Sequence, residues 1–315
     1  MRLLMAALAA CLAGEALASC GTAFCMVNTG WSTQGAWIEP GARIDLRFEY
    51  IDQDQPMSGS RKVGVGEIAR HHDEVRTLNR NWLAKVDYTF SADWSVSATL
   101  PLLDRRHAHI HNHMGAQLHD SWKLTEMGDV RVLGRRQWRA ESVEAQRLDF
   151  YGASFGLKLP TGKQDERNAE GALAERTLQP GTGTTDLLAG GDFRRTLGSG
   201  SSWFVDALVQ KALKPHDNFK PGTRTSLDLG YRLEATEQLG LMLQLNASHR
   251  ARDRGSDAEP AHSGGRFLFL SPGASYVLME TVQVYGFLQL PLYQHVNGVQ
   301  LTADWALVAG ISTRF

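Results

Sequence analysis

Histidine is the residue type whose spacing in this sequence suggests chemistry most directly. Four histidines alternate with other residues over positions 107–113, and two more stand together at positions 71 and 72. Side chains two positions apart in an extended chain point to the same side, so the alternating imidazoles can converge. Neutral imidazole is a ligand for zinc, copper and nickel. The candidate metal ligands are His71, His72, His107, His109, His111, His113 and His119.

This histidine pattern leaves two interpretations open. The first is contact with a divalent transition metal, to which Asp73 and Glu74 could add carboxylate ligands. The second is a hydrophilic surface loop, or a loop that responds to pH because histidine titrates near neutrality. No cofactor is certain from the pattern, and a divalent transition metal is the one that it suggests.

Motifs of known enzymes are not matched. The histidine spacing differs from the H-E-x-x-H pattern of zinc hydrolases. The Gly-rich run 181–186 lacks the Gly-Lys-Ser/Thr ending of a phosphate-binding loop, and a loop that re-enters a strand explains it better. We therefore expect a protein that is not an enzyme.

The N-terminus has the composition of a secretory signal peptide. Arg2 precedes an apolar run from Leu3 to Ala13, and Ala16-Leu17-Ala18 fits an A-x-A cleavage site. Residues 1–18 are therefore excluded from the fold. We expect residues 19–41 to form a periplasmic N-terminal segment.

Two cysteines, Cys20 and Cys25, would remain after that cleavage, in a compartment that favours disulfides. A local disulfide between them is one interpretation. Lipidation of Cys20 is another, because the preceding residues, Leu17-Ala18-Ser19, resemble a bacterial lipobox. A copper or haem site is the third, although the C-x-x-C-H haem pattern is absent from the sequence.

The segments that must position the histidines alternate between apolar and polar side chains. Segment Ala42–Asp52 puts Ile44 and Leu46 on one face and Arg43 and Arg47 on the other. A soluble core cannot take unpaired charges at every second position, whereas a water-filled lumen can. About twelve segments share the pattern, each near the roughly 9–11 residues of a tilted membrane strand. They are Ala42–Asp52, Asn79–Phe90, Trp94–Leu102, Gly128–Trp138, Leu148–Leu159, Asp186–Leu197, Trp203–Lys211, Ser226–Glu234, Leu239–Ser248, Phe267–Leu278, Val282–Leu292 and Gln300–Phe315.

Charged side chains on the polar faces of these segments are the candidate lumen residues. Opposite charges in the set could pair and close the lumen, so conduction is a hypothesis. The candidates are Arg43, Arg47, Glu49, Lys85, Asp87, Asp129, Arg131, Asp206, Asp228, Arg232 and Asp304.

The last segment, Gln300–Phe315, ends the chain on an aromatic residue. A terminal Phe resembles the assembly signal of bacterial outer-membrane barrels, so Phe315 is the candidate signal and the assembly machinery a partner. If the C-terminus is periplasmic, the connections sort into short inner turns and long outer loops. All 11 histidines then fall in outer loops or at the outer mouths of strands.

Together these patterns predict an all-β fold. We expect a single antiparallel transmembrane β-barrel of about twelve strands over residues 42–315, with periplasmic termini, in the outer membrane of a Gram-negative bacterium. A soluble β-sandwich would alternate similarly but would not explain the inward charges. Membrane lipid is an expected partner, and the formal net charge of −1 argues against nucleic acid.

Three short motifs carry a family resemblance. They are Gly128-Asp129-Val130, the run 156–162 (GLKLPTG) and the run 181–186 (GTGTTD), with Pro291-Leu292-Tyr293 near the end. The chain from Ala42 onward resembles the outer-membrane transporter family named after the phenol meta-cleavage pathway. The resemblance implies a barrel and the passage of small molecules, and it supplies no catalytic residues.

The sequence therefore predicts a narrow pore through which small solutes cross the outer membrane. The alternative is a barrel scaffold whose His-rich extracellular loops bind copper, zinc or nickel for uptake or sensing. A small-molecule or metal solute is the expected partner in either case.

Overall fold

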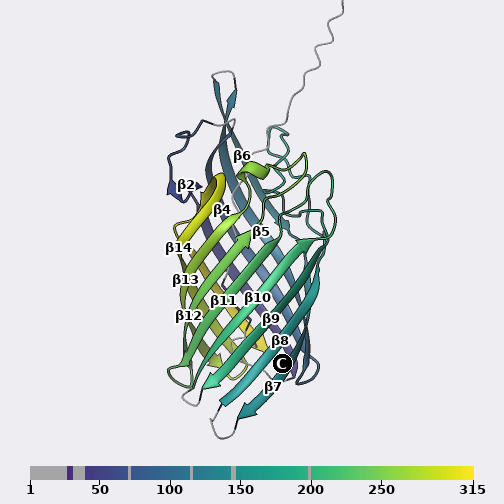
Figure 1. The fold of residues 1–315 in the computed structure, drawn as a ribbon, viewed down its shortest axis with the longest axis vertical. Coiled ribbons are helices and arrows are strands. Elements are labelled where there is room, and N and C mark those ends of the chain that lie inside the picture. The colour runs from purple at the N-terminus through teal and green to yellow at the C-terminus, as the bar shows by residue number, and fades with distance from the viewer. Residues whose placement is uncertain (1–26, 31–39, 70–71, 114–115, 143–146, 198–199) are drawn as a thin grey trace, which may run out of the picture.

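Twelve antiparallel strands close into a β-barrel in the computed structural model, as the sequence predicts (Figure 1). The structure describes residues 27–30, 40–69, 72–113, 116–142, 147–197 and 200–315. Each strand pairs with its neighbours in the chain, and the pairing of β1 with β15 closes the barrel. The barrel strands are β1 Gly41–Gln53, β4 His72–Thr89, β5 Trp94–His113, β7 Arg131–Ser142, β8 Arg147–Lys158, β9 Asp186–Leu197, β10 Ser201–Ala212, β11 Arg224–Glu234, β12 Leu239–Arg250, β13 Gly265–Met279, β14 Val282–Thr302 and β15 Ala306–Arg314.

Alternation of side chains makes these segments strands and orients them. In β12, Leu241 and Leu243 are 44% and 47% exposed on the outside, while Met242 and Gln244 between them are 5% and 1% exposed inside. Apolar side chains that face outward all round a barrel are the pattern of a wall in contact with lipid. The described residues include no helix with the length and hydropathy needed to span a membrane.

Three further strands lie at the end of the barrel opposite Phe315, which we call the distal end (Figure 1). They are β2 Gln55–Gly59, β3 Arg61–Lys62 and β6 Ala116–Met127. Strand β6 pairs with the extended end of β5, from Leu102 with Met127 to His113 with Ala116.

This pairing corrects the predicted position of the alternating histidines. The sequence predicts that the histidines between the segments Trp94–Leu102 and Gly128–Trp138 lie in an outer loop, but residues 104–127 lie in strands β5 and β6. Strand β4 likewise begins at His72 instead of Asn79. The physical reason is that the alternation continues with histidine and charged residues in place of apolar ones, so polarity alone suggested a loop.

The closing strand is interrupted where the sequence suggested continuity. Residues 303–305 separate β14 from β15, although the register of Ala306 with Ile51 continues as Thr302 with Gln55. Asp304 lies in this break. Its side chain is 53% exposed and pairs with Lys62 Nζ at 2.7 Å, so it does not belong with the lumen residues as predicted.

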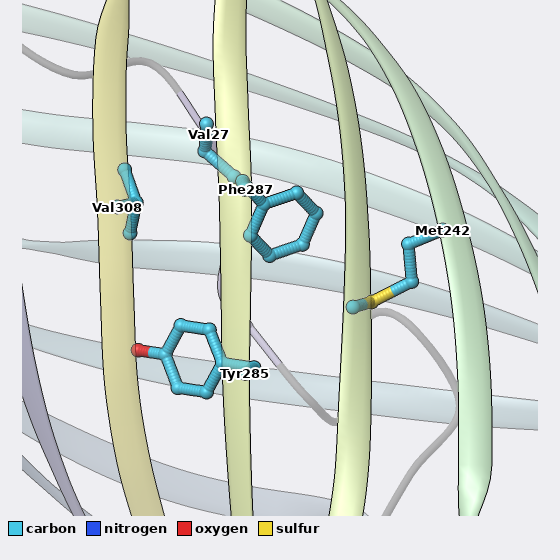
Figure 2. Packing of buried hydrophobic residues seen from close by; sticks show 5 residues of the cluster. All are labelled: Val27, Met242, Tyr285, Phe287 and Val308. Atoms are coloured by element: carbon cyan, nitrogen blue, oxygen red, sulfur yellow. The ribbon is translucent and has the colours of Figure 1, made fainter.

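A short piece of the predicted periplasmic segment 19–41 lies inside the barrel. The Asn28 backbone N donates to Gln244 Oε1 at 3.0 Å, and Gln244 Nε2 donates to the Asn28 carbonyl at 2.9 Å. Arg47 Nη1 donates to Thr29 Oγ1 at 2.8 Å. Figure 2 shows Val27 beside Phe287, within a buried cluster completed by Met242, Tyr285 and Val308. Residues 27–30 therefore fill part of the lumen, and no alternation in the sequence announced it.

The predicted signal peptide 1–18 and the cysteines Cys20 and Cys25 lie outside the described residues. Phe315 is described: its backbone N donates to the Ala42 carbonyl at 2.9 Å, and the residue is 75% exposed. This hydrogen bond connects the C-terminal residue to the start of β1. The role of Phe315 as an assembly signal stays a prediction.

Candidate functional site

Ten of the eleven predicted lumen residues lie on the inner face of the barrel wall, Asp304 being the exception. Five of them are buried: Arg43, Glu49, Asp129, Asp228 and Arg232. Four are partly buried: Arg47, Lys85, Asp87 and Asp206. Arg131 is exposed although it lies on the inner face, because it borders an internal cavity.

Several of these charges pair along their own strand. Arg47 Nη2 lies 2.9 Å from Glu49 Oε1, and Lys85 Nζ lies 2.8 Å from Asp87 Oδ1. Residues two apart on a strand share a face, so such pairs form without crossing the lumen. These two pairs neutralise four charges of the inner wall.

A cavity of about 280 Å³ lies inside the barrel. Its charged lining is mainly cationic. The cations are Arg47, Arg105, Arg131, Lys158 and Arg224, and the carboxylates are Glu49 and Asp129. Arg131 differs from the others, because it has no hydrogen bond or ion pair to any residue that the structure describes.

The three sequence motifs converge at the distal side of this cavity. Asp129 Oδ2 accepts from Lys158 Nζ at 2.7 Å and from the Thr182 backbone N at 3.0 Å. Asp129 Oδ1 accepts from the Gly162 backbone N at 3.1 Å. A Cβ added at Gly162 would lie 2.7 Å from Gly181 Cα. The backbones of residues 162 and 181 can therefore touch only because both residues are glycine.

The network fastens the connection between β8 and β9, residues 159–185, across the distal mouth; we call this connection the mouth loop. Lys158 Nζ also donates to the Thr184 carbonyl at 2.9 Å, so both ends of the mouth loop meet one buried ammonium group. The motifs thus have a structural role in positioning the loop, and no phosphate-loop geometry is involved.

A histidine cluster lies on the continuation of the same inner face of β5. We define it as His72, His107, His109 and His111. His107 Nε2 and His109 Nδ1 are 3.3 Å apart, and His72 Nε2 and His111 Nδ1 are 3.2 Å apart. His107 Nδ1 lies 2.9 Å from Thr77 Oγ1, which fixes the orientation of that ring.

Carboxylates surround the histidine cluster. Glu74 Oε2 lies 3.5 Å from His107 Nε2, and Asp120 Oδ2 lies 3.7 Å from His109 Nε2. Glu175 Oε1, which the mouth loop contributes, lies 3.7 Å from His109 Nδ1. Within the described ranges, however, no group of three or more His, Cys, Asp or Glu side chains is placed to hold a metal ion.

Burial sets the protonation of the two central histidines, which lie beyond the roughly 9–11 residues of β5 that cross the membrane. Removal from water lowers the pKa of His107 well below its ordinary value of 6.5. Burial also lowers the pKa of His109 to about 4, against an opposing effect of Asp120. Both imidazoles are therefore neutral at pH 7, which is the form that binds metals.

The predicted metal ligands are thus brought together only in part. His72, His107, His109 and His111 converge, whereas His119 is exposed opposite Ile110. His71 lies outside the described residues, as does the side chain of His113. Sequence reasoning missed Asp120, which the alternation of β6 could have indicated, and Glu175, for which no local signal exists.

Comparisons with known proteins match the fold and not the sequence. No family model matches, and no curated protein matches in sequence. The COG4313 outer membrane channel from Pseudomonas putida F1 is similar with a TM-score of 0.67 at 13% identity, covering 92% of this chain and 100% of that chain. A TodX mutant described as a monoaromatic hydrocarbon channel has a TM-score of 0.44 at 10% identity, over 88% of this chain and 91% of that one. A Pseudomonas aeruginosa FadL homologue has a TM-score of 0.41 at 11% identity, over 88% and 90%.

At these identities the likeness concerns the fold. The chain is a twelve-stranded β-barrel of the Gram-negative outer membrane, and its structural neighbours include outer-membrane channels and transporters. The narrower resemblance to the phenol-pathway family stays a prediction.

Proposed function

We propose that the protein forms a narrow pore for the passage of small solutes across the outer membrane. The observation that carries the proposal is the cavity of about 280 Å³ inside the barrel, lined by charged and polar side chains. A twelve-stranded barrel is wider than the roughly eight-stranded kind that its own side chains fill. A lumen of this size therefore has room for solutes and water.

Two segments narrow the pore. Residues 27–30 bind the inner wall through Gln244 and Arg47, and the mouth loop covers the distal end. We propose that the distal end faces the cell exterior and that both termini are periplasmic, because long connections on one side and short turns on the other are typical of such barrels. Passage then requires a solute small enough to move past both segments.

Planar-bilayer recording of the purified protein tests the pore. We expect a small, stable conductance, and an increase when Val27, Asn28 and Thr29 are all changed to Gly, because the internal contacts of residues 27–30 are lost. The lipid-facing substitution Leu243→Val is a matched control that should leave conductance unchanged. No conductance above background in any of the three proteins contradicts the proposal.

We propose divalent transition-metal binding as a second candidate function. The favouring observation is that neutral, buried imidazoles face buried carboxylates, since a buried carboxylate is stable only when a proton or cation compensates it. His107, His109, Glu74 and Glu175 would hold the ion, and Thr77 would orient the His107 ring. Facing atoms are 3.3 Å apart between His107 and His109, 3.5 Å between His107 and Glu74 and 3.7 Å between His109 and Glu175.

Calorimetric titration with Zn²⁺ or Ni²⁺ tests the second candidate. Wild type and His119→Ala should bind alike, because His119 is exposed and away from the cluster. His109→Asn should lose at least tenfold in affinity. Equal affinity in all three proteins removes the metal from the cluster.

A further inference from the structure

The lining of the lumen cavity has a polar part and an apolar part, which adjoin on the inner wall. Thr99 pairs directly with Arg131, and Arg131 pairs with Lys158. Residues directly opposite on paired strands share a face, so these three side chains form a polar belt on the inner wall. Leu83 of β4 pairs with Pro101 of β5, which lies two residues after Thr99.

The polar side carries an excess of positive charge. Five cationic side chains and two carboxylates line the cavity. Of these, Arg47 is paired with Glu49, and Lys158 with Asp129. A solute at this level therefore meets a positive field, which attracts anions and disfavours cations.

Arg131 is the side chain in the belt that is open to a ligand. It is exposed to the cavity and has no polar partner among the described residues. A guanidinium group offers a planar fork of N–H donors that fits a carboxylate in a bidentate manner. Its neighbours in register are a hydroxyl, at Thr99, and an ammonium group already held by Asp129, at Lys158.

The part of the cavity lining that adjoins this belt is apolar. Leu83, Pro101, Leu103 and Pro180 line it without offering a side-chain donor or acceptor. Such a surface accommodates the carbon skeleton of a ligand, but it offers no hydrogen bonds to a sugar or an inorganic ion. The volume of about 280 Å³ restricts the ligand to a small molecule.

We infer that the cavity is a binding site for a small organic monoanion, with the carboxylate on Arg131 and the apolar body against Leu83 and Pro101. The inference deepens the proposed pore function, on which it rests for its physiological meaning. It names a solute class that combines one negative charge with a compact apolar body. Weak binding at this level would concentrate such solutes in the pore without holding them.

The experiment measures binding and conduction separately. Benzoate is titrated into the folded, detergent-solubilised protein by calorimetry, with formate and benzyl alcohol as probes of charge alone and apolar body alone. Benzoate is also added to planar-bilayer recordings made in potassium chloride. We expect benzoate to bind and to reduce the chloride current, and formate and benzyl alcohol to bind at least tenfold more weakly.

Substitutions assign the two halves of the site. Arg131→Gln should weaken benzoate binding by about tenfold or more, because hydrogen bonds between charged groups are lost, and Arg131→Lys should retain part of it. Leu83→Ser should reduce the preference for benzoate over formate. Arg136→Gln is the matched control, because Arg136 lies on the same strand but packs on Trp94 and Trp138 at the outer face.

The outcomes separate this inference from the pore proposal. Conductance without benzoate binding, or binding that Arg131→Gln leaves unchanged in a folded protein, overturns the inference and leaves the pore intact. Benzoate binding that depends on Arg131, without conductance, supports the site and contradicts the pore.

Discussion

The lumen cavity and the histidine cluster lie on the same face of one strand, yet Arg131 at the cavity is exposed whereas His107 and His109, the two central imidazoles of the cluster, are buried. On β5, Pro101 and Leu103 line the cavity, and His107 and His109 belong to the cluster. The difference comes from what lies opposite. Arg131 borders the lumen cavity, whereas His107 and His109 pack against Trp122 of β6, and Ala174 and Leu178 of the mouth loop pack on Trp122 in turn.

This contrast shows how one alternating pattern can serve two kinds of chemistry. In the lumen cavity, a charge such as Arg131 can remain without a partner among the described residues. In the covered cluster, removal from water makes the His107 imidazole neutral, and Glu74 Oε2 lies 3.5 Å from its Nε2. Arg105 stands between the two regions and donates to the carbonyls of Thr177 and Leu178, which fixes the inner edge of the cover.

The largest effect is expected from breaking the fastening of the mouth loop. Lys158→Met should destabilise the folded barrel by about 3–5 kcal/mol, because Asp129 and Asp186 would remain buried without their cation. Denaturant unfolding in detergent measures it. Lys163→Met removes an exposed pair with Glu126 in the same loop and should change stability by less than about 1 kcal/mol. Equal effects in the two variants would contradict the role given to Lys158.

Acid should open the histidine cluster. The pKa of His109 is about 4 in the folded protein, against an ordinary value of 6.5, so the unfolded chain binds more protons between these values. The stability of the β4–β6 sheet should therefore be highest above pH 6.5, and protonation of His109 alone should lower it by about 3 kcal/mol as the pH drops toward 4.

Hydrogen exchange of β4–β6 at pH 7.5 and pH 5, corrected for intrinsic rates, measures this local opening, with β13 as the internal reference. His119→Ala should show the same pH dependence as wild type, because its imidazole is exposed. A uniform response of all strands to acid would show that the cluster is not the sensitive region.

An intermediate effect is expected inside the lumen, where residues 27–30 are held. Gln244→Ala removes two hydrogen bonds to the backbone of Asn28 and should loosen the segment by about 1–3 kcal/mol. Bilayer conductance should rise, while the unfolding midpoint of the barrel changes little. Thr236 lies in the turn between β11 and β12. Thr236→Ala serves as the comparison and should leave the conductance unchanged.

The smallest effect on stability is expected in the lumen cavity. Arg131→Gln should change the unfolding free energy by no more than about 0.5 kcal/mol, because the side chain has no partner to lose among the described residues. The same variant should strongly alter anion binding. A loss of several kcal/mol would mean that Arg131 is structural, and would place it with Lys158 in the fastening network.

Much of the wall was predictable because alternation of side chains is a local property. Ile44, Leu46 and their equivalents face outward as expected, and Arg43 and Glu49 face inward. The error at residues 104–127 arose where the alternation is between polar residues, since charge and histidine suggest a loop unless pairing partners are known.

The parts of the site that escaped prediction depend on contacts between distant segments. Glu175 reaches His109 only because the mouth loop folds back over β5. Val27 and Asn28 reach the lumen wall across most of the chain, and no periodic pattern marks them. Such contacts follow from the closed barrel and are not visible in any window of the sequence.

The placement of residues 27–30 has a consequence for the order of assembly. Their partners, Gln244, Phe287 and Val308, belong to strands β12, β14 and β15, the last to be synthesised. Strand β1, which follows the segment, forms the seam with β15. The segment can make these contacts only when the late strands are in place, so we expect the lumen to fill after those strands have paired.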